Sequence, residues 1–118
     1  MLQNVTAEDL VRTRRYLTAM ARQEGAHILV VDGDRQIRTM LARYLSDNGL
    51  RVTAAEDGWQ MTELVGKFRF DAVILDVMMP GDDGFTLCQR LRARSTVPII
   101  LLTARGDDTD RVIGLELG

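Results

Sequence analysis

The chain has 118 residues, a formal net charge of −2 and 46% hydrophobic residues. This length fits one domain, and the apolar content together with 27% charged residues argues against disorder. The slightly acidic balance gives no reason to expect direct nucleic-acid binding, and no apolar run reaches the ~20 residues that span a membrane. Cys88 is the one cysteine, so no intrachain disulfide can form, and the composition predicts a cytoplasmic protein without a membrane partner.

Residues 1–26 are expected to form an N-terminal helical extension, with a helix at residues 7–23. Three apolar residues recur on one face of this helix and are expected to pack on the sheet of the following domain. They are Leu10, Leu17 and Met20. We therefore divide the chain into this extension and a domain at residues 27–118.

From His27 onward, short apolar runs alternate with helical patterns. Strands are predicted at residues 27–31, 51–55, 71–75 and 97–102, and helices at residues 35–47, 58–66, 84–93 and 107–117. The expected helix caps are Asp34, Asp57 and Asp83, with a Schellman-type stop at Asn48 and Gly49. Apolar strands joined by helical crossovers form a parallel sheet with helices on both faces. The sequence therefore predicts the α/β class, with an open parallel sheet.

The helical patterns also predict which side chains face the core. The candidates are Ile37, Met40, Leu41, Tyr44 and Leu45 in the first helix of the domain, Trp59, Leu64 and Val65 in the next, and Phe85, Leu87, Cys88 and Leu91 in the third.

Polar residues follow three of the predicted strands at the point where each strand ends. Asp32 and Asp34 follow the first strand, Asp76 the third and Thr103 the fourth. In open α/β sheets, ligands bind at the carboxyl ends of the strands. Two carboxylates ~4 Å apart repel each other by about 4 kcal/mol at an effective dielectric constant near 20. A divalent cation between Asp32 and Asp76 would remove this repulsion, and oxygen ligands suit Mg²⁺.

Three stretches carry a resemblance to the receiver domain of two-component response regulators. They are Ile28-Leu-Val-Val-Asp32, Leu75-Asp-Val-Met-Met-Pro-Gly-Asp-Asp-Gly84 and Ile99-Ile-Leu-Leu-Thr-Ala104. Residues 38–45 and 87–92 resemble the subfamily that is fused to winged-helix DNA-binding domains. The resemblance implies a flavodoxin-like receiver fold with strand order 2-1-3-4 and a signalling role rather than an enzymatic one.

The resemblance also implies a role for each site residue. Asp76 matches the phosphoacceptor, and Asp32 matches the first residue of the acidic pair that binds Mg²⁺. The backbone carbonyl of Met78 matches the main-chain metal ligand, and Thr103 matches the switch hydroxyl. The implied partner is a sensor histidine kinase.

The sequence departs from the family pattern in two places. Gly33 occupies the position of the second acidic residue, so weak Mg²⁺ binding and impaired phosphorylation are expected. Asp34 is a further candidate ligand, with helix capping as the alternative. The chain is expected to be truncated before the family's fifth strand, with its invariant lysine, and fifth helix. Lys67, the only lysine, lies elsewhere in the pattern.

Two other functions are compatible with these residues. The domain could be a pseudo-receiver, which is an interaction module that takes no phosphate. Asp32 and Asp34 also resemble the nucleophile and the acid/base residue of haloacid-dehalogenase-type phosphatases. Whatever the function, a sheet that lacks a fifth strand would leave residues 97–102 as an apolar edge strand. We expect the chain to self-associate through this edge.

Overall fold

The computed structural model describes residues 15, 18–20, 22, 25–76, 79, 84–105 and 107–116, without the side chains of residues 85 and 103–116. The elements are β1 (His27–Val31), α2 (Arg35–Asp47), β2 (Arg51–Ala55), α3 (Gly58–Lys67), β3 (Ala72–Asp76), α4 (Gly84–Arg92), β4 (Ile99–Arg105) and β5 (Asp107–Glu116). Most of the helix predicted at residues 7–23 lies outside the described residues, although residues 15 and 18–20 are helical.

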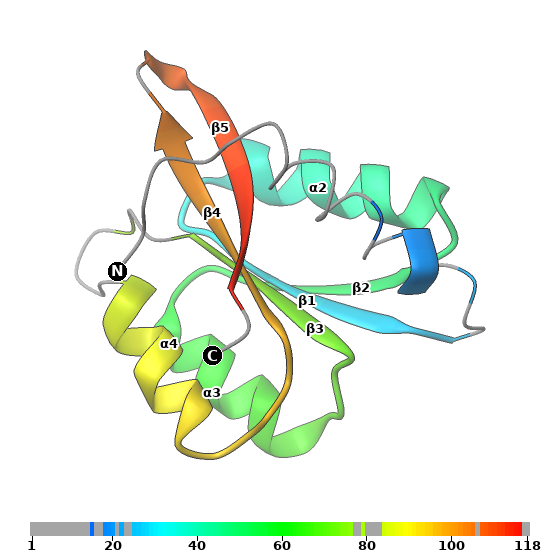
Figure 1. The fold of residues 1–118 in the computed structure, drawn as a ribbon, viewed down its shortest axis with the longest axis vertical. Coiled ribbons are helices and arrows are strands. Elements are labelled where there is room, and N and C mark those ends of the chain that lie inside the picture. The colour runs from blue at the N-terminus through cyan, green and yellow to red at the C-terminus, as the bar shows by residue number, and fades with distance from the viewer. Residues whose placement is uncertain are drawn as a thin grey trace.

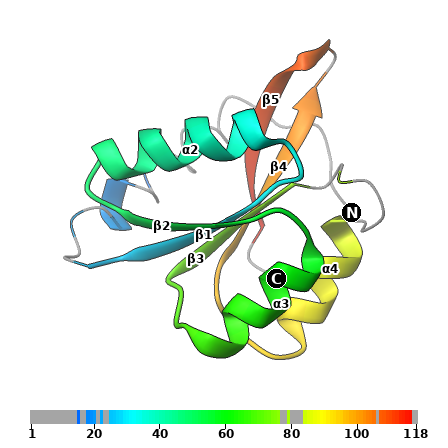
Figure 2. The same cartoon turned by 180° about the vertical axis from the view of Figure 1, so that it is seen from behind.

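One sheet with the order β2-β1-β3-β4-β5 organises the described chain. Strands β1 to β4 are parallel and follow the predicted order 2-1-3-4, which confirms the α/β receiver-like architecture. Helix α2 lies on one face of the sheet, and α3 and α4 lie on the other (Figures 1 and 2).

Residues 107–116 of the segment predicted as a last helix (residues 107–117) form a strand instead, so that prediction is wrong. β5 runs antiparallel to β4, with Ile99 paired to Glu116 at one end and Arg105 to Asp107 at the other. A short isolated helix is marginal in water, whereas pairing satisfies the backbone groups along the edge of β4. Because β4 is an inner strand, the expected self-association through the edge at residues 97–102 loses its basis.

Successive residues of the central strands face opposite sides of the sheet, which produces two hydrophobic clusters. Beneath α3 and α4 lie Leu29, Val31, Val73, Leu75, Ile99 and Leu101, together with Met61, Leu87 and Leu91 from the helices. Beneath α2 lie Ile28, Val30, Ala72, Ile74, Ile100 and Leu102, together with Leu41 and Leu45. Since both faces are covered, the central strands read as continuous apolar runs.

Met20 is buried within the cluster beneath α2, where its side chain is 7% exposed. This position confirms the expectation that Met20 packs against the domain. The other two residues of the predicted apolar face, Leu10 and Leu17, lie outside the described residues.

Local signals set the ends of the helices as predicted. Asp34 caps α2 by accepting hydrogen bonds from the N–H groups of Gln36 and Ile37, and Asp57 caps α3 by accepting one from the N–H of Gln60. At the end of α2, Leu50 N donates to Leu45 O (3.1 Å) and Gly49 N to Ser46 O (3.0 Å). Gly49 has a φ of 87°, a conformation that side chains disfavour, which completes a Schellman motif. Asp83 lies outside the described residues.

Three aromatic or long apolar side chains that were predicted to face the core are exposed. Met40 is 56% exposed, Tyr44 54% and Trp59 69%. Each lies at the margin of an apolar helical stripe, and the sheet covers the centre of the stripe at Leu41, Leu45 and Met61 instead. Leu64, Val65 and Cys88 pack against the cluster beneath α3 and α4 while remaining partly exposed, and Leu87 and Leu91 are buried.

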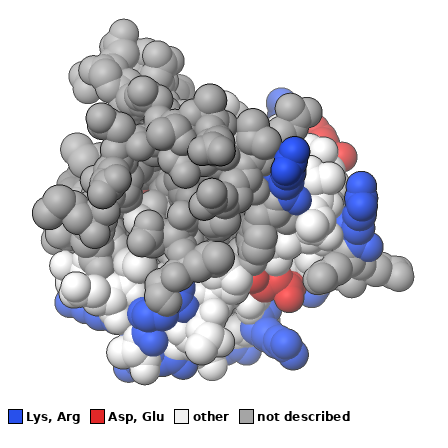
Figure 3. Space-filling model, viewed as in Figure 1, with Lys and Arg blue, Asp and Glu red and all other residues white. Residues whose placement is uncertain are grey.

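On the described part of the face seen in Figure 3, Lys and Arg lie near the lower and right margins, with acidic and uncharged side chains between them. None of the helices in the described part of the chain combines the length and apolar character that crossing a bilayer requires.

Candidate functional site

Asp32 and Asp76 lie on neighbouring strands at the carboxyl edge of the sheet. Val31, the last residue of β1, pairs with Leu75 of β3, so the next residue of each chain segment is one of these aspartates. Paired strands run ~4.8 Å apart, which puts the two residues side by side. Asp32 is 1% exposed and Asp76 2%, and they are the buried charged residues of the described chain. We call them the acidic pair.

The backbone around Asp32 is fixed by three hydrogen bonds. Its N–H donates to Ala55 O of β2 (3.1 Å), and its Oδ1 accepts from the N–H of Asp34 (2.8 Å). Its carbonyl oxygen accepts from Nη1 of Arg38 on α2 (2.8 Å). The sheet and α2 therefore hold the Asp32 backbone, and the N–H of Asp34 holds its carboxylate.

Asp34 is exposed, and its Oδ1 accepts hydrogen bonds from Gln36 N (2.8 Å) and Ile37 N (3.3 Å). These contacts are those of an N-cap residue. The structure thus gives Asp34 the capping role that the sequence allowed as the alternative to metal binding.

Substitutions of Asp34 separate the two roles. Asp34→Ala should lower the free energy of unfolding by about 1 kcal/mol, whereas Asp34→Asn should change it little because asparagine caps equally well. If capping is the whole role of Asp34, the Mg²⁺ affinity of Asp34→Asn should stay within roughly threefold of the wild-type value, since solvent screens an exposed charge. Urea unfolding and a Mg²⁺ titration measure both effects. A loss of Mg²⁺ affinity in Asp34→Asn well beyond that factor would show direct coordination.

The other predicted site residues are described only in part. Asp76 is the last residue of β3 and pairs with Leu102, so Thr103 lies one residue further along β4 at the same edge. The Thr103 side chain and the whole of Met78 lie outside the description. Met79 is buried in the cluster beneath α3 and α4.

The acidic pair offers carboxylate oxygens, which are the kind of ligand that suits a divalent cation such as Mg²⁺. Two buried carboxylates ~4 Å apart would repel each other by about 4 kcal/mol at an effective dielectric constant near 20. Mg²⁺ is typically held by one or two carboxylates while it keeps several waters. No group of three His, Cys, Asp or Glu side chains suited to a metal occurs in the described part of the chain. Gly33, directly after Asp32, carries no carboxylate.

Arg38 contacts this site although the sequence analysis did not single it out. The residue is four positions after the cap Asp34, in the first turns of α2, and it is half-buried. Side chains on a helix lean toward its N-terminus, which directs Arg38 back to the loop at Asp32. The sequence signal for this contact was a basic residue one turn into the helix that follows Asp32, the aspartate at the end of β1.

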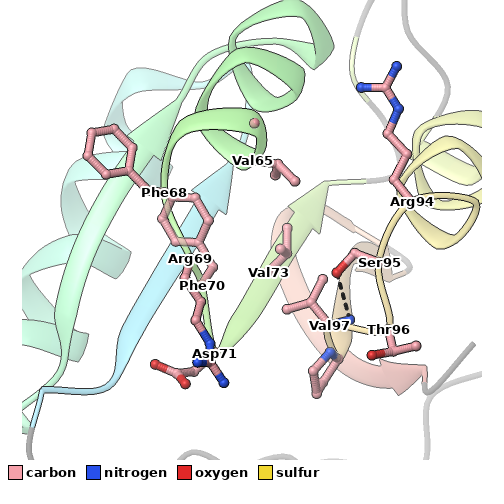
Figure 4. Close-up of a pocket in the computed structure, with 12 residues that line it drawn as sticks. Val65, Phe68, Arg69, Phe70, Asp71, Val73, Arg94, Ser95, Thr96 and Val97 are labelled. Atoms are coloured by element: carbon pink, nitrogen blue, oxygen red, sulfur yellow. Dashed lines mark hydrogen bonds between the residues drawn. The ribbon is translucent and has the colours of Figure 1, made fainter.

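A separate cavity of about 560 Å³ lies at the opposite, amino edge of the sheet. Figure 4 shows it between the chain that enters β3, with Arg69 and Asp71, and the chain that enters β4, with Ser95 and Val97. Val65 and Val73 are among its apolar lining residues, and Ser95 Oγ accepts a hydrogen bond from Val97 N (3.1 Å). Neither residue of the acidic pair lines it, so the cavity is not part of the candidate site.

His27 lies near that amino edge. Its backbone N–H donates to Asp71 Oδ2 (2.8 Å), and its Nε2 is 2.6 Å from Thr53 Oγ1. Burial and the neighbouring Arg51 lower the pKa of His27, and Asp71 opposes this shift. These contacts tie β1 to β2 and to the start of β3, away from the acidic pair.

The family model of the response regulator receiver domain matches residues 28–118. The chain belongs to the response regulator receiver family. This family is one of signalling receivers and not an enzyme family, and its members bind Mg²⁺ at the phosphorylation site.

Curated response regulators are similar to this receiver over most of its length. Protein PetR of Rhodobacter capsulatus is 46% identical over 92 residues, which is 78% of this chain and 39% of PetR. Response regulator MprA of Mycobacterium sp. (strain KMS) is 49% identical over 92 residues, covering 77% of this chain and 40% of MprA. The receiver thus spans about two fifths of the length of these relatives.

Solved structures agree with the fold of this receiver. The beryllofluoride-activated receiver domain of RstA from Klebsiella pneumoniae is 36% identical with a TM-score of 0.64, covering 70% of both chains. TrrA from Thermotoga maritima, solved in complex with Mg²⁺ and beryllofluoride, is 35% identical with a TM-score of 0.65, covering 69% of this chain and 71% of TrrA.

Proposed function

We propose that this receiver is a phosphoacceptor of a two-component system, in which Asp76 accepts a phosphoryl group from a sensor histidine kinase. The observation that carries the proposal is the burial of Asp32 and Asp76 on adjacent strand tips of a receiver fold. The likeness to TrrA, which binds Mg²⁺ and beryllofluoride, supports the same chemistry here.

The chemistry follows from the two carboxylates. A carboxylate oxygen of Asp76 attacks phosphorus and forms an O–P bond, while the bond from phosphorus to the donor breaks and its electron pair leaves with the donor. Asp32, Asp76 and the Met78 carbonyl would hold Mg²⁺, which supplies positive charge to the phosphoryl oxygens. Thr103 is proposed as the hydroxyl that binds a phosphoryl oxygen and carries the switch. Because Gly33 contributes no ligand, we propose that metal binding and phosphorylation are weak.

Phosphorylation by a small acyl phosphate tests the proposal. Incubation with acetyl phosphate and Mg²⁺ should add the mass of one phosphoryl group, and the adduct should be labile to hydroxylamine as an acyl phosphate is. Asp76→Asn should abolish the adduct, since an amide is a far weaker nucleophile than a carboxylate. Asp47→Asn, which removes an exposed carboxylate from α2, is the matched control and should leave it unchanged.

An adduct that survives in Asp76→Asn would place the acceptor elsewhere and contradict the proposal. No adduct in the wild type at high acetyl phosphate and Mg²⁺ would favour the second function, a pseudo-receiver that acts by protein interaction alone. The observation that favours this alternative is Gly33, which leaves the described acidic site with two carboxylates.

A further inference from the structure

Two arginines lie near the start of α2, the helix that Asp34 caps. The first turn of this helix contains no acidic residue, although a helix N-terminus carries about half a positive charge and normally attracts acidic side chains. Arg35 and Arg38 are both near this end of α2. A cation here is repelled by the helix dipole, which the N-cap carboxylate of Asp34 offsets in part, so a further compensating interaction favours this position.

Arg38 has such an interaction in the loop of the acidic pair. Its Nη1 donates to the backbone carbonyl of Asp32 (2.8 Å), while Arg35 and Arg43 on the same helix are exposed. The guanidinium therefore stays within a few Å of a residue whose carboxylate is 1% exposed. In such a half-buried place, solvent screens charge interactions less than at the surface.

Asp76 shares this side of the sheet edge with Arg38. Ile74, two residues earlier in β3, belongs to the cluster beneath α2, and strand residues two apart face the same way. The acidic pair and the start of α2 thus lie at the same edge and on the same face of the sheet.

We propose that Arg38 is a positioning residue that also supplies counter-charge to this site. Its hydrogen bond holds the loop carrying Asp32, and its charge offsets that of the acidic pair and attracts an anionic phosphoryl group. The part that concerns the phosphoryl group rests on the proposed function, whereas the part that concerns the acidic pair does not.

A double-mutant cycle on stability tests the counter-charge without any ligand. Arg38→Gln and Arg38→Lys both lose the guanidinium fork and keep a donor, but only Lys keeps the charge. In the wild-type background, Gln should raise the unfolding equilibrium constant by roughly tenfold more than Lys. In the Asp76→Asn background, where half of the acidic charge is gone, that difference should shrink by at least about threefold. Urea unfolding at low ionic strength measures the unfolding equilibrium constants of the four variants, which are Arg38→Gln and Arg38→Lys in each background.

Ligand binding supplies a second test with opposite signs. Arg38→Gln should tighten Mg²⁺ binding by roughly threefold because it removes a repelling cation, and should weaken beryllofluoride binding at saturating Mg²⁺ by roughly tenfold. Arg38→Lys and the exposed-site control Arg43→Met should match the wild type in both titrations. A residue that only holds the loop would instead weaken both ligands when changed to either Gln or Lys.

Equal effects of Gln and Lys in the stability cycle, unchanged by Asp76→Asn, would overturn the proposal for Arg38. A wild-type protein that binds neither Mg²⁺ nor beryllofluoride would overturn the proposed phosphoacceptor function, and the cycle would still decide the role of Arg38.

Discussion

Replacing Ile74 by alanine should lower the free energy of unfolding by about 2–5 kcal/mol. Ile74 is 1% exposed in β3, the central strand, and it packs beneath α2 among residues of β1, β4 and the helix. The rigid strands on either side limit how far the fold can collapse into the vacated space, so the cost should fall in the upper part of this range. Chemical denaturation followed by circular dichroism measures it.

Trp59→Ala is the matched control for Ile74→Ala. It removes a larger side chain, but one that is 69% exposed on α3, so the free energy of unfolding should change by no more than about 0.5 kcal/mol. A loss of stability comparable to that of Ile74→Ala would mean that Trp59 belongs to the core, contrary to the structure.

Changing Gly33 to aspartate should increase the affinity for Mg²⁺ by roughly ten- to a hundredfold, because it adds a carboxylate beside the acidic pair. The backbone permits the change, since the described glycines with positive φ are Gly25 and Gly49 and Gly33 is exposed. Without metal, the third carboxylate should instead lower stability by repulsion. Binding of Mg²⁺ to the folded state should then restore it.

Thermal unfolding with and without Mg²⁺ and isothermal titration measure these two opposite effects. Gly66→Asp serves as the control, because it adds the same charge on α3 where a side chain meets open space. If Gly33→Asp left the Mg²⁺ affinity unchanged, the metal would not be bound next to Asp32, and the assignment of Asp32 as a ligand would fail.

Features set by neighbours in the sequence were predictable. The caps at Asp34 and Asp57 and the stop at Gly49 depend on hydrogen bonds within a few residues, and the structure contains each of them. The acidic pair was predictable because the carboxyl ends of parallel strands meet at one edge, so that the order of the strands sufficed to bring Asp32 and Asp76 together.

Features set by distant partners were not predictable in the same way. The spacing of apolar residues in residues 107–117 is compatible with a helix. A strand forms instead because its backbone groups can pair with the edge of β4. The apolar faces of the helices extend to Met40, Tyr44 and Trp59. How much of each apolar face the sheet covers depends on the rotation of the helix about its own axis, and these three residues are left exposed. The position of Arg38 one turn into α2 could have suggested a contact with the loop at Asp32, but the side-chain conformation that makes this hydrogen bond is set by the folded structure.

The antiparallel pairing of β5 also bears on the order in which the sheet can form. Ile28 of β1 must find Ala72 of β3 across a crossover that contains two helices and a strand, whereas Arg105 of β4 pairs with Asp107 almost next to it in the chain. Closing the longer loop has the larger entropic cost, and hairpins form within microseconds. Among the described strands, β5 is therefore the one whose assembly depends least on the rest of the domain.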